Sequence, residues 1–256
     1  MSPHEVIATM YEAARLPLIF AHRGAQAYTP ANTLPAFELA RAQGADGIEL
    51  DVHRSKDGHP VILHDFTITV PERGEVRVAD LTLAELKRLD VGSEFSPAFA
   101  KTPIPTLDEV FEVVGRDLWI NVEIKSMTVE TDGVEEVVAA CITRHNMGQR
   151  VILSTFNSYC LWRFRALAPG VPIGLLQATD LPIPLYERVN EQMYQAYHPN
   201  ERMVDEHLME TAHNAGHVVN VWTVNDPQRA VALRDLGVHG IITDAPDVIL
   251  RAVGRG

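Results

Sequence analysis

Two carboxylates lie two residues apart in the apolar run GIELDV (residues 47–52), which predicts a buried strand. Because side chains alternate across a strand, Glu49 and Asp51 point to the same face, near its carboxyl end. The run INVEIK places Glu123 and Lys125 on one face in the same way. Converging buried carboxylates repel one another without a cation, and an all-oxygen ligand set favours Mg²⁺ or Ca²⁺ over zinc. Spacing alone more often marks a solvated edge or an ion pair, so the metal site is a hypothesis.

A histidine is predicted to join these carboxylates through a hairpin. After Asp51 the chain reads VHRSKDGHPVILHD, and a two-residue loop of Asp57 and Gly58 would fold it into antiparallel strands. With that loop, Asp51 lies opposite His64, and both side chains share one face. A β-bulge would shift this register by one residue.

Further reactive groups end other predicted strands. His22 and Arg23 follow a strand in the sequence LIFAHRG. Since imidazole titrates near neutral pH, His22 and His64 suit an acid and base pair, although the sequence does not say which is which. Arg23 and Lys125 could hold the non-bridging oxygens of a phosphate. Trp222, near the carboxyl end of another strand, is either a core residue or a wall of the substrate pocket.

These residues are positioned by alternating strand and helix patterns, which are typical of βα units around a parallel sheet. The predicted strands are 18–22, 47–52, 120–125, 151–156, 172–177, 193–199, 218–224 and 240–244. Helical patterns between them include 33–43, 133–145, 158–168 and 226–237. We therefore expect an α/β fold, a TIM-like (β/α)8 barrel over residues 1–256 as one domain, with a small insertion after the second strand at about 52–107. A doubly wound open sheet is the alternative, but no GxGxxG turn follows the first strand.

Composition narrows the classes of partner. The chain has 256 residues and a net charge of −12, which disfavours nucleic acid and anionic membrane surfaces. Its first twenty residues make a poor signal peptide, and no apolar run approaches the roughly 20 residues of a membrane span. With only Cys141 and Cys160 present, we expect a reducing, cytoplasmic setting and no stable membrane association.

The motifs together resemble the glycerophosphodiester phosphodiesterase family. AHRG, ADGIELDVHRSKDGHPVILHD, NVEIK, VNVWTVND and GIITDAPD occur in the family's order, and the resemblance covers nearly the whole chain. It implies a TIM barrel, a divalent metal held by Glu49, Asp51 and Glu123, and His22 and His64 as general acid and base. It also implies that glycerophosphodiesters are hydrolysed to glycerol 3-phosphate and an alcohol, with attack by the glycerol 2-hydroxyl and a cyclic phosphate that water then opens.

Two departures from the family pattern stand out. The family usually reads Pro-Glu-Asn-Thr after the HRG turn, and here Ala31 replaces the glutamate. We expect that position to support the loop and not to bind the metal. After Asp65 the chain reads TVPERGEV, where many relatives carry a turn rich in Arg and Thr, which could change the pocket's preference.

Other functions and several details stay open. A lipid phosphodiesterase of the lysophospholipase D or sphingomyelinase D type would need an apolar patch, and a non-catalytic phosphoester-binding protein would not need the histidines. The sequence does not choose Mg²⁺ over Ca²⁺, the alcohol, or whether the chain forms a homo-oligomer. His145 is expected to be an ordinary surface or packing residue, and Trp162 is expected to pack.

Overall fold

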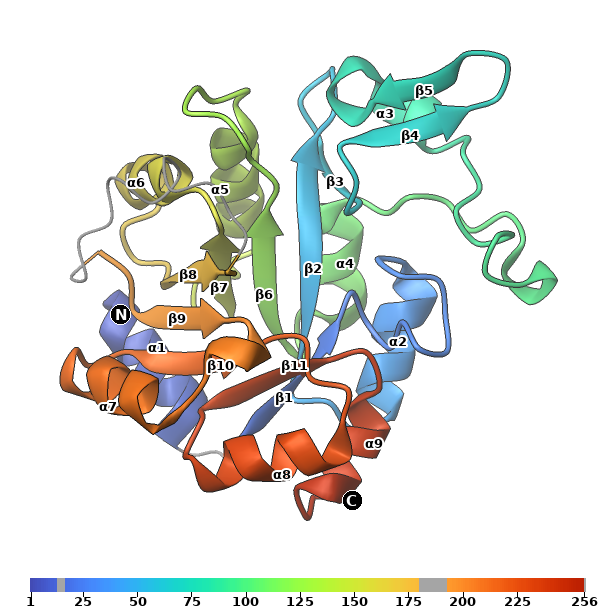
Figure 1. Cartoon of the computed structure of the whole chain (residues 1–256). Helices are drawn as coiled ribbons and strands as arrows, with labels where there is room; N and C mark the ends of the chain where they lie inside the picture. The colour runs from blue at the N-terminus through green and yellow to red at the C-terminus, as the bar shows by residue number, and fades with distance from the viewer. Residues whose placement is uncertain (13–16, 180–192, 256) are drawn as a thin grey trace.

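Eight parallel strands form a closed barrel in the computed structural model, which describes residues 1–12, 17–179 and 193–255. Neighbouring strands pair in the order β1, β2, β6, β7, β8, β9, β10 and β11, and β1 pairs with both β2 and β11. The strands are β1 (Leu18–His22), β2 (Gly47–Arg54), β6 (Trp119–Ile124), β7 (Val151–Thr155), β8 (Ile173–Gln177), β9 (Ala196–Pro199), β10 (Val218–Val221) and β11 (Gly240–Thr243). The predicted barrel is confirmed, and the alternative of an open sheet is wrong (Figure 1).

Helices surround the barrel. They are α2 (Leu34–Ala42), α4 (Leu107–Val114), α5 (Val134–Arg144), α6 (Ser158–Leu167), α7 (Glu206–Asn214), α8 (Pro227–Asp235) and α9 (Pro246–Ala252). One more helix, α1 (Pro3–Glu12), closes the amino-terminal end of the barrel, where its Met10 and Tyr11 pack with Phe20 of β1. None of the helices in these described segments is long and apolar enough to cross a membrane.

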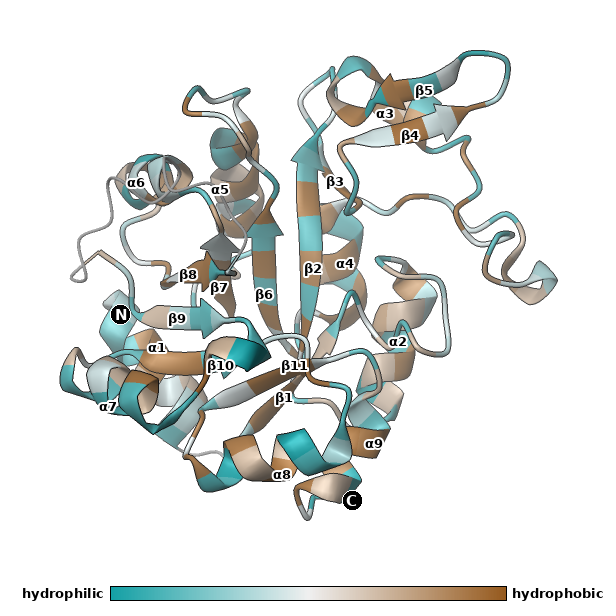
Figure 2. Ribbon diagram, in the orientation of Figure 1, coloured by the Kyte–Doolittle hydropathy of each residue, from teal (hydrophilic) through white to brown (hydrophobic). Residues whose placement is uncertain are grey.

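Strand alternation divides the buried side chains into two sets. In β2, Ile48 and Leu50 face outward and pack with helix residues such as Phe37 of α2 in the main core. The residues between them, Glu49 and Asp51, therefore face the barrel interior. Figure 2 shows the resulting stripes of apolar and polar residues along β2 and β6. Apolar burial against the helices thus fixes the inward direction of the carboxylates.

The insertion expected after the second strand is a small lobe with its own apolar cluster. It contains β3 (Pro60–Ile62), the two-stranded sheet of β4 (Thr67–Val70) and β5 (Gly74–Arg77), and the short helix α3 (Leu83–Leu86). Val61, Val78, Leu81, Leu86 and Ile104 form the buried centre of this lobe. Figure 1 shows the lobe beyond the carboxyl end of β2, beside the mouth of the barrel.

The predicted hairpin register is wrong by one residue. Val52 pairs with Ile62, so Asp51 lies opposite Leu63 and not opposite His64. The loop has three residues because the backbone N–H of Ser55 donates to His59 (2.9 Å) and Gly58 adopts a left-handed φ of 85°. β3 ends at Ile62, and the chain then turns so that His64 still reaches the barrel mouth.

Candidate active site

Three buried carboxylates meet inside the carboxyl end of the barrel. Asp51 of β2 and Glu123 of β6 are partners across the parallel pair, and Glu49 lies one inward position earlier on β2. One carboxylate oxygen from each residue lies within 4.8 Å of the other two. Their exposed fractions are only 4% for Glu49, 1% for Asp51 and 8% for Glu123. This oxygen-only arrangement could hold a hard divalent cation.

Two cationic side chains border the carboxylates. The Lys125 ammonium lies 2.8 Å from Glu123 Oε1 and 3.3 Å from Asp51 Oδ1. Arg23 Nε lies 3.1 Å from Asp51 Oδ2, and the backbone N–H of Arg23 donates to Glu49 Oε2 at 3.2 Å. Asp51 is therefore compensated by two cations, whereas the contacts of Glu49 among the described residues are the N–H group of Arg23 and, at 3.9 Å, the imidazole of His22.

The carboxyl pKa values follow from this unequal compensation. Burial raises the pKa of Glu49 well above its ordinary value, and the charges of Asp51 and Glu123 raise it further. Burial also raises the pKa of Glu123 to about 7 despite Lys125. Burial acts in the same direction on Asp51, but Lys125 and Arg23 together lower its pKa. The cluster thus has three buried carboxylates beside two protein cations, an imbalance that a bound cation would correct.

Each candidate histidine contacts an aspartate. His22 Nδ1 lies 2.6 Å from Asp244 Oδ1, and His64 Nδ1 lies 2.7 Å from Asp65 Oδ1. A carboxylate oxygen accepts from Nδ1–H, which leaves Nε2 of the neutral ring as the acceptor. His22 Nε2 lies on the side of Glu49, at 3.9 Å. Burial lowers the pKa of His64, which favours its neutral form.

A cavity of about 180 Å³ brings these groups together. It is lined by His22, Arg23, Glu49, His64, Glu123, Lys125, Phe156, Leu176, Trp222, Thr223 and Ile242. Trp222 packs edge-on against Phe156 at 5.5 Å and donates its indole N–H to the carbonyl of His198 (2.8 Å). All the predicted site residues line this cavity except Asp51, which lies directly beneath it in contact with Arg23 and Lys125.

Asp244 and Asn32 also orient the site, and the sequence did not single them out. Asp244, directly after β11, holds His22 and accepts from the side-chain amide of Asn225 at 2.6 Å. Asn32 donates from Nδ2 to Asp51 Oδ2 at 2.8 Å and adopts a left-handed φ of 57°. Asp244 could have been found because it ends a predicted strand, as His22 does. The role of Asn32 depends on a loop conformation that its local sequence did not reveal.

The substitution at position 31 lies beside this loop. Ala31 is exposed, and the residues that line the cavity do not include it. The neighbouring Asn32 keeps its contact with Asp51. The geometry agrees with the expectation that position 31 contributes to the loop and not to the acidic cluster.

The mouth of the barrel combines buried carboxylates and histidines around one cavity, and comparisons with known proteins identify the chain as a phosphoric diester hydrolase. Residues 22–248 match the model of the glycerophosphoryl diester phosphodiesterase family, to which the chain belongs. A glycerophosphodiester phosphodiesterase of Caldanaerobacter subterraneus is 41% identical over 93% of this chain and 98% of the relative.

Solved structures show the same fold. A phosphodiesterase of Oleispira antarctica, in complex with the product sn-glycerol-3-phosphate, has a TM-score of 0.80 and 31% identity over 93% of this chain and 97% of its own. A putative glycerophosphoryl diester phosphodiesterase of Silicibacter pomeroyi has a TM-score of 0.81 and 27% identity over 95% of both chains.

Proposed function

We propose that this enzyme hydrolyses glycerophosphodiesters to glycerol 3-phosphate and an alcohol in a reaction that requires Mg²⁺ or Ca²⁺. The observation that carries the proposal is the convergence of three buried carboxylates and two aspartate-bonded histidines on one cavity. The product bound to the Oleispira antarctica relative supports glycerol 3-phosphate as the product here.

Glu49, Asp51 and Glu123 would hold the cation. Their oxygens are close enough to share one ion, and the raised pKa values of the two glutamates support this assignment, because burial without a cation disfavours their charged forms. When bound, a divalent ion would lower the pKa of a coordinated hydroxyl and neutralise charge on the phosphoryl oxygens. It would also compete with Arg23 and Lys125 for the carboxylates, which frees these cations to contact the phosphate.

His22 and His64 would transfer the protons. One imidazole accepts the proton of the glycerol 2-hydroxyl as that oxygen bonds to phosphorus, and the other donates a proton to the alcohol oxygen as its bond to phosphorus breaks. Water then opens the cyclic phosphate with the two roles exchanged, which leaves glycerol 3-phosphate. The Nδ1 contacts to Asp244 and Asp65 fix the tautomer and orientation of each ring for this exchange. Trp222 and Phe156 would form an apolar wall against the glycerol or the alcohol.

One observation favours a second candidate, a lysophospholipase D-type activity. Phe66 and Met127 are exposed large apolar residues, at 43% and 47%, in the segments that follow His64 and Lys125. Apolar side chains near the mouth could contact the acyl chain of a lysophospholipid.

We also propose a cytoplasmic location. Cys141 and Cys160 are both free of disulfide bonds, as is usual for proteins of reducing compartments.

The substrate is tested by incubating the protein and added Mg²⁺ or Ca²⁺ with glycerophosphocholine, and separately with lysophosphatidylcholine. We expect glycerol 3-phosphate from the first, little lysophosphatidic acid from the second, and loss of turnover in His22→Ala and His64→Ala. His207→Ala, which changes an exposed histidine of α7, is the matched control and should keep full activity. Faster release of lysophosphatidic acid would favour the lipid enzyme, and binding of glycerophosphocholine without cleavage would favour a non-catalytic protein.

A further inference from the structure

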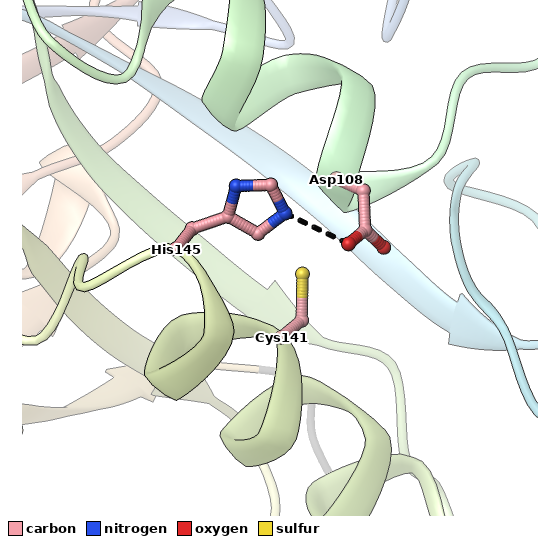
Figure 3. Close-up of side chains that lie close together, drawn as sticks. All are labelled: Asp108, Cys141 and His145. Carbon is pink, nitrogen blue, oxygen red and sulfur yellow. Dashed lines mark hydrogen bonds and ion pairs between the residues drawn. The ribbon is translucent and has the colours of Figure 1, made fainter.

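A second group of metal-ligating side chains lies on the outer layer of the barrel, away from the acidic cluster. Figure 3 shows Asp108, Cys141 and His145 directed toward one point. One ligand atom from each residue lies within 4.8 Å of the other two, and His145 Nε2 lies 2.8 Å from Asp108 Oδ1. Cys141 is fully buried, whereas Asp108 and His145 are partly exposed.

The helices explain why these residues converge. Cys141 lies on α5, and His145 is the residue that caps its carboxyl end, so the two share one helix face four residues apart. Asp108 lies in the first turn of α4, where a capping box between Thr106 and Glu109 fixes the start of the helix. α4 and α5 are in contact. Two packed helices, α4 and α5 with its cap, therefore hold the three ligands.

We propose that Asp108, Cys141 and His145 form a Zn²⁺ site, separate from the catalytic cation site. Thiolate, imidazole and carboxylate are the ligands of zinc, whereas Mg²⁺ and Ca²⁺ take oxygen. Ligand atoms around tetrahedral zinc lie about 3.3 to 3.6 Å apart, so the contact between His145 Nε2 and Asp108 Oδ1, now 2.8 Å, would lengthen by about 0.5 Å when an ion binds. The Cys141 thiolate and the Asp108 carboxylate would together neutralise the charge of the ion.

The guanidinium of Arg144 now neutralises Asp108, as a bound metal ion would. Its Nε and Nη2 donate to Asp108 Oδ1 at 3.0 and 2.5 Å. The Arg144 side chain is 55% exposed, so it can leave Asp108 for water when an ion binds. His145, in contrast, packs edge-to-face with the ring of Phe111, with ring centres 5.6 Å apart.

A surface pocket reaches the Asp108 side of the group and has room there for a fourth ligand. It has a volume of about 500 Å³, and its lining includes Asp108, Arg144, Thr106 and the hairpin residue His59. A water molecule in this pocket could complete the tetrahedron at Asp108. The pocket shares no lining residue with the catalytic cavity, so the two ions would bind independently.

Cobalt substitution tests the proposal because thiolate coordination to Co²⁺ gives a near-ultraviolet charge-transfer band, which carboxylate ligands do not give. The chain has only two cysteines, so Cys160→Ser on α6 is the matched control for Cys141→Ser. We expect one equivalent of the band in wild type and Cys160→Ser, and none in Cys141→Ser. Absence of the band in wild type, or its loss only in Cys160→Ser, would overturn the proposal.

Competition with a chromophoric chelator measures Zn²⁺ affinity in variants of the more exposed residues. His145→Gln should weaken binding at least tenfold, and Arg144→Gln should strengthen it by removing the competing guanidinium. Unchanged affinity in both would overturn the site even if Cys141→Ser failed to fold. These readouts do not use phosphodiester cleavage, so they stand apart from the test of the proposed function.

Discussion

Glu49→Gln separates metal binding from the stability of the metal-free barrel. Burial, with Asp51 and Glu123 nearby, raises the pKa of Glu49 well above its ordinary value, which favours the protonated side chain in the metal-free protein, and glutamine is a neutral group of nearly the same shape. The backbone N–H of Arg23, 3.2 Å from Glu49 Oε2, can donate equally to the amide oxygen of glutamine. In chelator, the two proteins should therefore unfold within about 1 kcal/mol of each other.

The gain in stability on adding Mg²⁺ or Ca²⁺ should distinguish Glu49→Gln from wild type. At a concentration of about 100 times Kd, a bound ion adds about 2.7 kcal/mol to the free energy of unfolding, which raises the Tm of a chain of this size by about 5 to 11 °C. If glutamine weakens binding about a hundredfold, the gain at that concentration falls to about 0.4 kcal/mol.

The assay is thermal unfolding in chelator and across a Mg²⁺ or Ca²⁺ titration. Glu112→Gln, which changes an exposed carboxylate of α4, is the control and should respond as wild type does. An equal rise in Tm for Glu49→Gln would refute the ligand role of Glu49. A loss of several kcal/mol in chelator would instead refute the argument that burial favours the neutral form of this carboxyl group.

Three further predictions follow from the same geometry. His22→Ala and His64→Ala should each lower kcat by about 10²- to 10⁴-fold while the circular dichroism spectrum stays that of wild type, and a smaller loss would exclude general acid–base catalysis. Asn32→Ala should weaken cation affinity about 10- to 100-fold in a metal titration, because Asn32 orients Asp51, and unchanged affinity would make that contact incidental. Burial lowers the pKa of His198 to about 3, so the unfolded chain binds a proton there below about pH 6.5 that the folded chain does not. The free energy of unfolding should therefore fall as the pH falls from about 6.5 toward 3. In denaturant unfolding at pH 7 and pH 4, His198→Gln should show a smaller loss than wild type. An identical pH dependence in the variant would contradict the lowered pKa of His198.

The barrel was predictable because its physical causes are local. β-branched runs and amphipathic segments define the strands and helices, and parallel strands bring their carboxyl ends to one mouth. The period-two alternation also gave the inward direction of Glu49, Asp51 and Glu123. The structure places these carboxylates, as well as His22 and His64, around one site, while their catalytic roles stay predictions.

What could not be predicted depends on single residues in loops and on contacts between helices. The left-handed Gly58 lengthened the hairpin loop and shifted its register. Trp162 was expected to pack but is 56% exposed, because an amphipathic pattern does not specify which neighbour covers each position. His145 was expected to be an ordinary surface or packing residue, and its contact with Asp108 arises only when α4 and α5 pack together.

The most direct test of the central claim is the rate of glycerol 3-phosphate release from glycerophosphocholine in excess chelator, followed by titration with Mg²⁺ or Ca²⁺. A cation held by three buried carboxylates predicts no release in chelator and recovery of the rate as the metal saturates the site. Glu123→Gln should need a higher metal concentration for the same recovery. An unchanged rate in excess chelator would contradict the assignment of Glu49, Asp51 and Glu123 to a catalytic cation.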